Sequence, residues 1–305
     1  MTENEFLLND RIEKIKSINK LYNLEENSYI SFSGGRDSTI LHYLLDMALP
    51  QNQIQRVYIN TGIEYKKITE YVKELQKKDN RIIIVDAKIN IKNMLENVGY
   101  PFKSKEFSEK LSVYQNSGKT KTVKNYLGET DYHTNGRFMC PQKLKVCFTD
   151  NFNLKVSKRC CNELKKKPAG KWARENKKNI VITGMRTAEG GARNQLNCTI
   201  FKDNQLKKFH PLAPLNDNFE KWFIETNNIK LCDLYYPPYN FERTGCKGCP
   251  YAPELQEELE KMKILLPNEF KQCYLIWGEV YTKYKELNYR LIKTDEENGQ
   301  QVLNF

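Results

Sequence analysis

Apolar and polar residues follow one another along this chain with two different periods. Over residues 4–23 apolar side chains recur three or four positions apart, which predicts an amphipathic helix. Further on, short apolar runs predict buried strands, and amphipathic stretches at 38–49 and 66–78 predict helices between the first three of them. The predicted strands are Tyr29–Ser33, Gln55–Asn60, Arg81–Asp86 and Asn179–Gly184. Alternating strands and helices imply an α/β fold with a doubly wound, mainly parallel sheet.

Three of these strands run directly into turns rich in glycine and polar residues. The turns cover residues 33–38, 60–64 and 184–193. The carboxyl ends of parallel strands share one edge of the sheet, and ligands of doubly wound sheets bind beyond that edge. We therefore expect the three turns to form one binding site.

The first turn has the chemistry of a phosphate site. It reads Ser-Phe-Ser-Gly-Gly-Arg-Asp-Ser over residues 31–38 and opens a helix, whose unpaired N–H groups and dipole attract an anion. Gly34 and Gly35 let a phosphate approach the backbone closely. Ser33 and Ser38 add hydroxyl groups, and Asp37 can cap the helix or orient the loop. Neither a Walker A loop nor a dinucleotide fingerprint is present, and the alternative is a serine-rich turn that only caps a helix.

This turn resembles the PP-loop of the adenine-nucleotide alpha hydrolase superfamily, whose signature is S-x-G-G-x-D-S. That superfamily includes ATP pyrophosphatases, tRNA and DNA sulfurtransferases, and the sulfonucleotide (APS and PAPS) reductases. The resemblance implies a sheet of the HUP or PP-loop type that holds the phosphates of a nucleotide at the first turn. The residues so implied are Ser31, Ser33, Gly34, Gly35, Arg36, Asp37 and Ser38.

The other two turns extend the resemblance to PAPS-reductase-like proteins of the phage and bacterial type. The second is similar to their N/D-T-G-x-E/H segment, and the third resembles their G-x-R-x-x-E-S-x-x-R motif, with Gly190 in place of the serine. Two guanidinium groups in one glycine-rich loop suit phosphate or sulfate. The implied nucleotide contacts are Asn60, Thr61, Gly62, Glu64, Gly184, Arg186, Glu189 and Arg193. The alternative is a pair of ordinary loops with solvated arginines.

Two cysteine pairs point to a metal cofactor. Cys160 and Cys161 are adjacent, and Cys246 and Cys249 form a CxxC motif far along the chain. This arrangement resembles the cluster motif of assimilatory APS reductases, which implies that the four thiolates bind a [4Fe–4S] cluster. Lys165 matches the lysine that those enzymes place between cluster and substrate. A single Zn²⁺ would bind an adjacent pair only with strain, and redox thiols are the remaining alternative.

The other cysteines and the histidines carry weaker signals. Cys140 and Cys147 are a rival source of metal ligands, because the segment 137–145 resembles one in related sulfurtransferases. The remaining cysteines are isolated, and the histidines lack a second ligand at metal spacing. We expect these residues to be structural: Cys198, Cys232, Cys273, His42, His133 and His210.

Length and charge limit the organisation and the partners. We expect a nucleotide-binding α/β domain at 1–230, with an insertion at about 100–157, and a small C-terminal iron–sulfur and helical appendage at 231–305. A net charge of +11 attracts nucleotides and nucleic acids, first in a loop expected at 119–124, although the abundance of Lys, Asn and Ile could reflect coding bias. No signal peptide or 18-residue apolar stretch is evident, so we expect a cytoplasmic protein with no membrane contact.

The resemblance supports two chemistries. In the first, ATP with Mg²⁺ is cleaved at its α–β bond, an acceptor is adenylated, and sulfur then displaces AMP. The acceptor would be a tRNA, a DNA or a small molecule, a partner protein would supply sulfur or electrons, and the expected catalytic residues are Asp37, Lys165 and Arg186. In the second, a cysteine thiolate attacks APS or PAPS and sulfite is produced. The reductases carry that cysteine in a C-terminal Glu-Cys-Gly-Leu-His motif, whereas this chain has no cysteine after Cys273.

We therefore expect adenylating sulfur transfer, with sulfonucleotide reduction as the alternative. A third hypothesis is a nucleotide-binding iron–sulfur sensor without turnover, which rests on the absent nucleophile and the basic charge. Pyrophosphate as product would indicate the first, sulfite the second and neither of them the third. The acceptor, the donor and the oligomeric state are open at this point.

Overall fold

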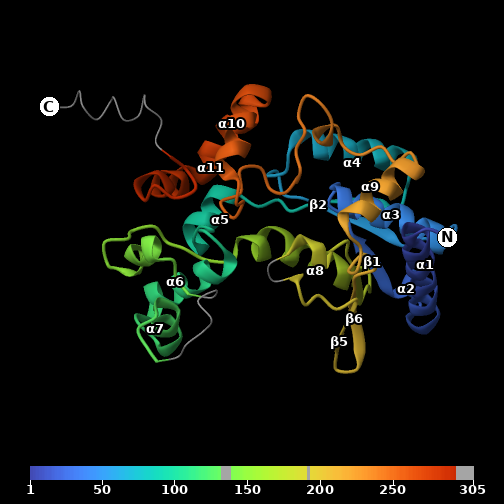
Figure 1. Cartoon of the computed structure of the whole chain (residues 1–305), viewed down its shortest axis with the longest axis horizontal. Coiled ribbons are helices and arrows are strands. Elements are labelled where there is room, and N and C mark those ends of the chain that lie inside the picture. Colours follow the sequence, from blue (N-terminus) through green and yellow to red (C-terminus); the bar gives the residue numbers. More distant parts are fainter. Residues whose placement is uncertain (132–138, 191–192, 293–305) are drawn as a thin grey trace. The chain divides into compact units, whose positions relative to one another are not determined.

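The computed structural model describes residues 1–131, 139–190 and 193–292 (Figure 1). Their contacts divide the chain into two compact units. Met1–Ala87 and Lys165–Gly245 form the first, here called the sheet unit. Lys88–Leu164 and the described residues from Cys246 onward form the second, here called the cysteine unit. The boundary predicted near residue 230 does not coincide with this division, because the C-terminal helices fold with the predicted insertion instead of forming an appendage of their own.

A six-stranded sheet lies at the centre of the sheet unit, with the strand order β3-β2-β1-β4-β6-β5. The strands are β1 (Ser28–Ser31), β2 (Gln55–Asn60), β3 (Ile82–Asp86), β4 (Ile180–Ile182), β5 (Thr199–Lys202) and β6 (Gln205–Phe209). Neighbouring strands pair in parallel, except that β5 pairs antiparallel with β6. This confirms the predicted α/β class with its mainly parallel sheet.

The direction in which strands are added reverses at the centre of the sheet. From β1 the chain adds β2 and β3 on one side, and it later adds β4 and β6 on the other. β1 and β4 pair directly, with Ile30 opposite Ile182. In open α/β sheets, ligands bind beyond the carboxyl ends of the strands at such a reversal.

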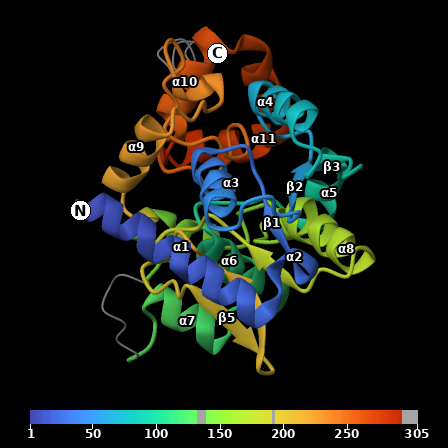
Figure 2. The same ribbon diagram turned by 90° about the vertical axis from the view of Figure 1, so that its right-hand side faces the viewer.

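Helices cover both faces of this sheet. They are α1 (Glu3–Tyr22), α2 (Leu24–Asn27), α3 (Arg36–Ala48), α4 (Lys66–Lys78), α8 (Lys167–Glu175) and α9 (Asp217–Thr226). On one face, Trp172 of α8 is buried with Tyr29 and Val57. Successive strand residues point to opposite faces, and Tyr58 meets Thr69 of α4 with its hydroxyl at 3.1 Å. α1, α3 and α9 pack against one another (Figure 2).

Two local features show how the sequence determines these elements. α1 begins with a capping box in which Thr2 and Glu5 accept each other's backbone N–H, and it confirms the helix predicted over 4–23. The β5–β6 hairpin was not predicted. Its turn, Asp203-Asn204, has two positive φ angles of 52° and 58°, which are typical of a tight hairpin turn.

The cysteine unit is built of helices and short helical turns. Its helices are α5 (Ile91–Val98), α6 (Lys105–Ser117), α7 (Lys121–Leu127), α10 (Leu255–Leu265) and α11 (Pro267–Glu286). The prediction of a loop at 119–124 is wrong in part, because α7 begins at Lys121. Aromatic rings form the core, where Phe102 contacts Phe107, Phe152 and Tyr284. Across the described ranges of both units, no helix is both long and apolar enough to cross a bilayer.

Candidate functional site

The first predicted turn lies between β1 and α3, at the carboxyl end of a central strand. Gly34 has a φ of +72°, which side chains rarely adopt, and a Cβ there would stand 2.8 Å from Val72. The hydroxyls of Ser33 and Ser38 lie 3.0 Å apart, and Ser38 donates to the carbonyl of Gly35 at 2.9 Å. These contacts hold a compact loop at the N-terminus of α3, where backbone N–H groups and the helix dipole favour an anion.

Two hydroxyl groups from a later segment face this loop. The N–H of Arg36 donates to the hydroxyl of Tyr235 at 2.9 Å, and that hydroxyl lies 2.6 Å from Oγ1 of Thr244. The guanidinium of Arg36 also lies over the Tyr235 ring, 5.1 Å from its centroid. Sequence analysis missed Tyr235 and Thr244 as site residues, because folding alone brings them to the loop and no local motif marks them.

The second turn follows β2 and is closed by Glu64. The Glu64 carboxylate accepts from the N–H of Thr61 at 3.0 Å and from its hydroxyl at 2.9 Å. The ammonium of Lys165 lies 3.2 Å from the same carboxylate. Asn60 receives the N–H of Gly62 at 3.3 Å. The structure therefore brings the predicted Lys165 to the second turn, and β2 adjoins β1 in the sheet.

The third turn follows β4 and meets the first. A Cβ at Gly184 would stand 2.8 Å from the carbonyl oxygen of Asp37, so a side chain there would push the two turns apart. Nε of Arg186 lies 3.4 Å from Oδ1 of Asp37. Glu189 accepts the N–H of Arg186 at 3.3 Å and forms an ion pair with Arg193. The carboxyl-end turns of β1 and β4 are thus in direct contact.

Arg186 lies buried among carboxylates. Its Nε is 2.9 Å from Oε1 of Glu220, and its Nη1 is 2.9 Å from Oδ1 of Asp217. With Asp37, three carboxylates surround one guanidinium. Burial, and then the nearby Asp37, raise the pKa of Glu220. Sequence analysis missed Glu220, because no local motif marks it.

Further guanidinium groups crowd the neighbourhood of Asp37. Burial lowers the pKa of Arg193, and the positive charges of Arg243 and Arg186 lower it further, while Asp37 opposes them. Like charges held this close repel one another, and a bound anion relieves the repulsion. The first and third turns together therefore have the electrostatics of a site for a multiply charged anion.

The four predicted cluster ligands all belong to the cysteine unit. Burial, and then the neighbouring Cys246, raise the pKa of Cys249, and Cys161 adds to the shift. The pKa of Tyr251 is raised by burial and, through their charges, by Cys161, Cys249 and Cys160. The structure thus brings the two cysteine pairs, which lie far apart in the sequence, into one neighbourhood.

The donors of this neighbourhood are thiols, the ligands that iron–sulfur clusters take and that zinc also accepts. The described part of the chain has one set of three or more His, Cys, Asp or Glu residues whose ligand atoms all lie within 4.8 Å of one another. That set contains no cysteine. Tetrahedral bonds of about 2.3 Å would place the sulfurs of a zinc site about 3.8 Å apart. A cubane of four irons accepts thiolates that are spaced more widely. Thiols with raised pKa values need bound cations to persist as thiolates.

Helices α10 and α11 hold the CxxC loop in place. Three side chains of α11 donate to carbonyls of the loop: Trp277 to Lys247 (3.1 Å), Tyr281 to Gly248, and Tyr284 to Pro250 (2.8 Å). From α10, Glu258 accepts the N–H of Gly248 at 3.2 Å. These contacts fix the backbone that carries two of the predicted ligands.

The rival cysteines form a second pair in the same unit. Burial, and then the nearby Cys140, raise the pKa of Cys147 to about 12. Among all nine cysteines, each of which lies in the described ranges, there is no disulfide. Several predicted features fall outside those ranges: the loop of His133, the start of the 137–145 segment, residues 191–192 of the third turn, and the chain after residue 292.

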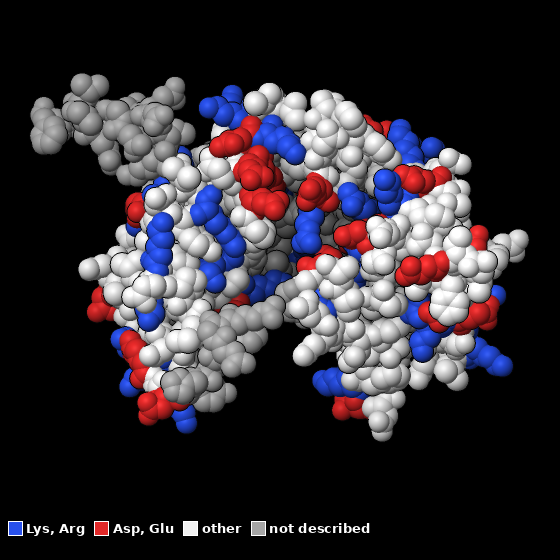
Figure 3. Space-filling model, in the orientation of Figure 1, with Lys and Arg blue, Asp and Glu red and all other residues white. Residues whose placement is uncertain are grey.

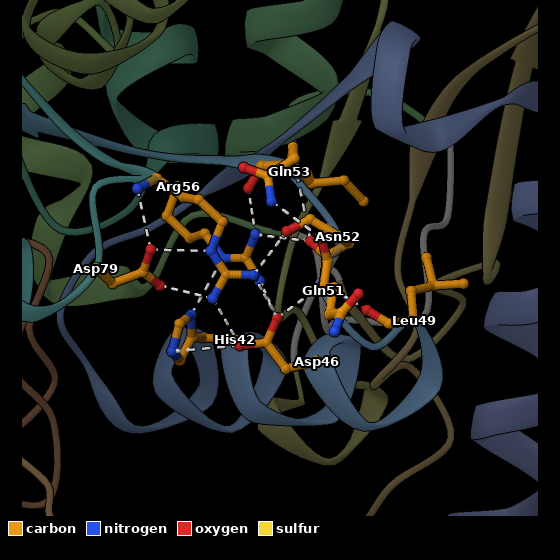
Figure 4. Close-up of polar contacts among 10 residues, drawn as sticks. His42, Asp46, Leu49, Gln51, Asn52, Gln53, Arg56 and Asp79 are labelled. Atoms are coloured by element: carbon orange, nitrogen blue, oxygen red, sulfur yellow. Dashed lines mark hydrogen bonds and ion pairs between the residues drawn. The ribbon is translucent and has the colours of Figure 1, made fainter.

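The one set of potential metal ligands with atoms within 4.8 Å of one another in the described residues lies at the amino end of β2. Its members are His42, Asp46 and Asp79. Two arginines already bind it (Figure 4): Arg56 reaches Asp46 at 2.6 Å and donates to Nδ1 of His42 at 3.1 Å. Arg81 pairs with Asp46 at 2.8 Å and with Asp79 at 2.7 Å. Burial, and then Arg56, lower the pKa of His42 to about 4. Two guanidiniums balance two carboxylates, so this network is structural and a metal ion would have to displace an arginine.

The positive net charge is not gathered over the face drawn in Figure 3, where Lys and Arg are interspersed with Asp and Glu. In the stretch predicted to meet nucleic acid, Lys119 is paired with Glu129 at 2.6 Å. The charge by itself therefore locates no nucleic-acid surface on this face.

The sequence matches the family described as phosphoadenosine phosphosulfate reductase domain, over residues 27–137 and 140–252. An uncharacterized protein of Methanocaldococcus jannaschii is 26% identical over 289 residues, which make up 90% of this chain and 54% of that protein. The chain thus spans about half the length of the curated relative it matches.

Solved structures of other enzymes are similar at low identity. A phosphoadenylyl-sulfate reductase from Candida auris has a TM-score of 0.43 at 13% identity, over 81% of this chain and 96% of that one. An FMN adenylyltransferase from Candida glabrata has a TM-score of 0.46 at 13% identity, over 78% and 61%. The U34-tRNA thiolase NcsA from Methanococcus maripaludis, solved with its [4Fe-4S] cluster, has a TM-score of 0.41 at 14% identity, over 95% and 83%.

Proposed function

Because the chain belongs to the phosphoadenosine phosphosulfate reductase domain family, we propose that it is a PP-loop enzyme that binds ATP at the N-terminus of α3. It would cleave ATP between the α- and β-phosphates and adenylate an acceptor, which then receives sulfur in an iron–sulfur-dependent step. The observation that carries this proposal is the crowding of Arg186, Arg193 and Arg243 near Asp37 in the first turn. A bound triphosphate would relieve the repulsion between Arg193 and Arg243.

The residues of the three turns would divide the work of the first step. An oxygen of the acceptor attacks the α-phosphorus, the bond to the bridging oxygen breaks, and pyrophosphate leaves with that electron pair. Ser33, Ser38 and the N–H groups that open α3 would hold the pyrophosphate, and the Mg²⁺ that enters with ATP would neutralise it. Lys165, which lies beside Glu64 in the second turn, would balance charge at the α-phosphate. A sulfur nucleophile then attacks the carbon of the acceptor that bears the adenylated oxygen, and AMP leaves with that oxygen.

The four cysteines of the cysteine unit would hold the cofactor. We propose Cys160, Cys161, Cys246 and Cys249 as ligands of a [4Fe–4S] cluster, on the basis of their shared neighbourhood. When bound, such a cluster would supply a site for sulfur or a path for electrons from a donor protein. The contacts of α10 and α11 with the CxxC loop support the ligands, as outer contacts do at metal sites in general.

The net charge of +11 supports a tRNA or DNA acceptor over a small molecule. Reduction of a sulfonucleotide is the second candidate, and the family match supports it directly. APS and PAPS carry the same adenosine phosphate as ATP and would occupy the same turn. The two functions differ in their products, which are pyrophosphate for the first and sulfite for the second.

Competitive binding to anaerobically purified protein tests the nucleotide. Labelled ATP with Mg²⁺ is challenged with APS and with PAPS, and pyrophosphate and sulfite are assayed in parallel. We expect ATP to be retained and pyrophosphate to form when tRNA or DNA is added. Displacement of ATP at much lower concentrations of APS or PAPS, together with sulfite, would contradict the proposal. A sensor without turnover would bind ATP and form neither product.

Matched charge variants locate the binding. Arg193→Gln and Arg243→Gln should each weaken ATP binding at least about tenfold, because each removes a charge-assisted contact of about 1.5–3 kcal/mol. Lys20→Gln removes one positive charge from the exposed surface of α1 in the same unit and should leave the affinity unchanged. An equal loss in all three variants would mean that net charge, and not the site, determines binding.

Iron and sulfide analysis tests the cofactor. Cys249→Ser should lose most of the bound iron and the visible absorbance of a cluster, whereas Cys198→Ser in the sheet unit should keep both. Zinc in place of iron in the anaerobic protein, or full iron content in Cys249→Ser, would contradict the assignment.

A further inference from the structure

Glu220 has no role in the chemistry proposed so far, yet it lies in the first turn of α9 at the centre of the third-turn contacts. It is 2% exposed, and its Oε1 stands 2.9 Å from Nε of Arg186. Within the described ranges neither of its carboxyl oxygens receives a hydrogen bond of regular geometry. Oδ1 of Asp37 lies 3.4 Å from the same Nε of Arg186, so the two carboxyl groups share one guanidinium nitrogen, and the charge of Asp37 acts on Glu220. Two carboxyl groups therefore meet in a buried place.

The charges around this pair do not balance. Arg186 brings one positive charge, whereas Asp37, Asp217 and Glu220 bring up to three negative ones. Asp217 projects into solvent, with 81% of its side chain exposed, so water can solvate its charge. In the buried part, Arg186 lies against both carboxyl groups, and Arg36 and Arg193 bring further positive charge near them. Two such groups cannot both be ionised at low cost, and one of them keeps a proton.

We propose that Glu220 keeps this proton at neutral pH and donates it in a hydrogen bond to the Asp37 carboxylate, so that the neutral acid positions the first turn for its nucleotide. The proposal rests on the proposed nucleotide site. Glu220 acts here through Asp37 and is a positioning residue. As a neutral acid it offers an O–H to Asp37 and a carbonyl oxygen to Nε of Arg186, which matches both neighbours.

The surrounding charges decide which carboxyl group holds the proton. Burial and Asp37 raise the pKa of Glu220, and Arg186 and Arg36 lower it. Asp37 and Arg36 come from α3, Arg186 from the turn after β4, and Asp217 from the same helix as Glu220. Glu220 is almost fully buried, whereas Asp37 is half-buried at the loop. The more buried group pays more for ionisation, so the proton belongs on Glu220.

Nucleotide binding should depend on this proton. Phosphates at the first turn add negative charge near Asp37 and favour the protonated form of Glu220 further. When alkaline pH removes the proton, two adjacent carboxylates repel each other and face the incoming phosphates. Affinity should therefore fall with rising pH, by at most about tenfold per pH unit for one linked proton.

Glu220→Gln separates this role from a merely structural one. Glutamine keeps the shape, donates from its amide to Asp37 and accepts from Arg186, but it cannot ionise. We would measure the affinity for α,β-methylene ATP with Mg²⁺ between pH 7 and pH 9.5. The wild-type protein should lose affinity along this series, and Glu220→Gln should keep its pH 7 affinity throughout. Glu225→Gln, an exposed change on the same helix, should follow the wild-type profile.

Two results would overturn the proposal. One is a pH profile of Glu220→Gln as steep as that of the wild type. The other is a tenfold or larger loss of affinity at pH 7 in a Glu220→Gln protein that melts like the wild type, because this would show that the ionised form is needed.

A second measurement is independent of nucleotide binding. The infrared carbonyl band of a protonated carboxylic acid should be present in the wild-type protein at pH 7, disappear at high pH, and be missing from Glu220→Gln. If the analogue binds at no pH while this band behaves as expected, the nucleotide proposal fails and the protonated Glu220 stands. If the band is absent from the wild type, the proposal for Glu220 fails even if ATP binds.

Discussion

The sheet unit contains two buried arginine clusters that look alike and are built differently. At the amino end of β2, Arg56 and Arg81 meet Asp46 and Asp79, and two positive charges balance two negative ones. At the carboxyl end of β4, the single guanidinium of Arg186 meets three carboxylates. A balanced cluster is complete by itself, whereas an excess of carboxylates favours a bound proton.

The position of each cluster in the sheet agrees with its charge balance. The amino ends of parallel strands serve stability in open α/β folds, and the carboxyl ends carry the ligand sites. The balanced cluster also contains His42, whose imidazole is kept neutral, so it adds no charge. The unbalanced cluster adjoins the crowded cations of Arg193 and Arg243. Charge balance therefore distinguishes the structural network from the candidate site, whereas burial alone does not distinguish them.

The largest expected effect is on the balanced cluster. Arg56→Met should lower the free energy of unfolding by about 3–5 kcal/mol, because Arg56 is fully buried and its removal leaves Asp46 and Asp79 with Arg81 as the one guanidinium of the network and takes a donor from Asn52. Denaturant titration measures this loss. Arg174→Met on the exposed side of α8 is the control and should stay within about 0.5 kcal/mol of the wild type. A loss below about 1 kcal/mol in Arg56→Met would show that the network is dispensable.

Sequence reasoning predicted β1 to β4 and the helices α1, α3 and α4 of the sheet unit, because their signals are local, but it did not predict β5, β6, α8 and α9. The Ser33–Ser38 turn, the strand ending at Asn60 and the Gly184 turn each carry their own pattern of glycines and polar residues. The partners Glu220, Tyr235 and Arg243 could not be predicted. They reach the first turn from distant parts of the chain, and each alone looks like any polar or aromatic surface residue.

The division into units was also beyond the sequence. From the sequence, the segment at about 100–157 was predicted to be an insertion into the sheet domain, and residues 231–305 a separate appendage. Their common core depends on long-range aromatic contacts, such as Phe102 with Tyr284, which no periodicity reveals. The cysteine pairs, in contrast, were predicted to meet because their spacing resembles a known motif, and the structure brings them together.

The second prediction concerns acid. The pKa of His42 is about 4 in the folded protein, below its ordinary value, so the unfolded chain binds a proton first as pH falls. Its contribution is fully present above about pH 6.5 and is lost between about pH 6.5 and 4, with a total of about 3 kcal/mol. His42→Gln, which can still accept from Arg56, should flatten this part of the stability curve. An unchanged slope in the variant would assign the acid sensitivity to another group.

The third prediction concerns alkaline pH, where stability should fall, and not rise, as the pH increases. The pKa of Glu220 is raised in the folded protein, so the native state holds a proton that the unfolded chain has released. Stability should fall as pH rises above the ordinary glutamate range, by up to about 1.4 kcal/mol per pH unit, until Glu220 ionises. Glu220→Gln should lack this slope, which can be followed as the difference in unfolding free energy between the two proteins from pH 6 to pH 9. Parallel curves for the two proteins would mean that Glu220 is ionised throughout.

The smallest expected effect tests whether the number of carboxylates around Arg186, and not their burial, determines how this cluster behaves. Asp217 lies as close to Arg186 as Glu220 does, at 2.9 Å, but 81% of its side chain is exposed. Water and salt screen such a pair, so Asp217→Asn should cost at most about 1 kcal/mol, less at high salt, and should leave the pH dependence of nucleotide binding in place. Equilibrium unfolding at low and high salt measures the loss of stability. Titration with the ATP analogue measures the pH dependence of nucleotide binding. If Asp217→Asn removed the alkaline loss of affinity, the proton would belong to the whole set of carboxylates. If the loss remains, the buried pair of Asp37 and Glu220 is what holds the proton.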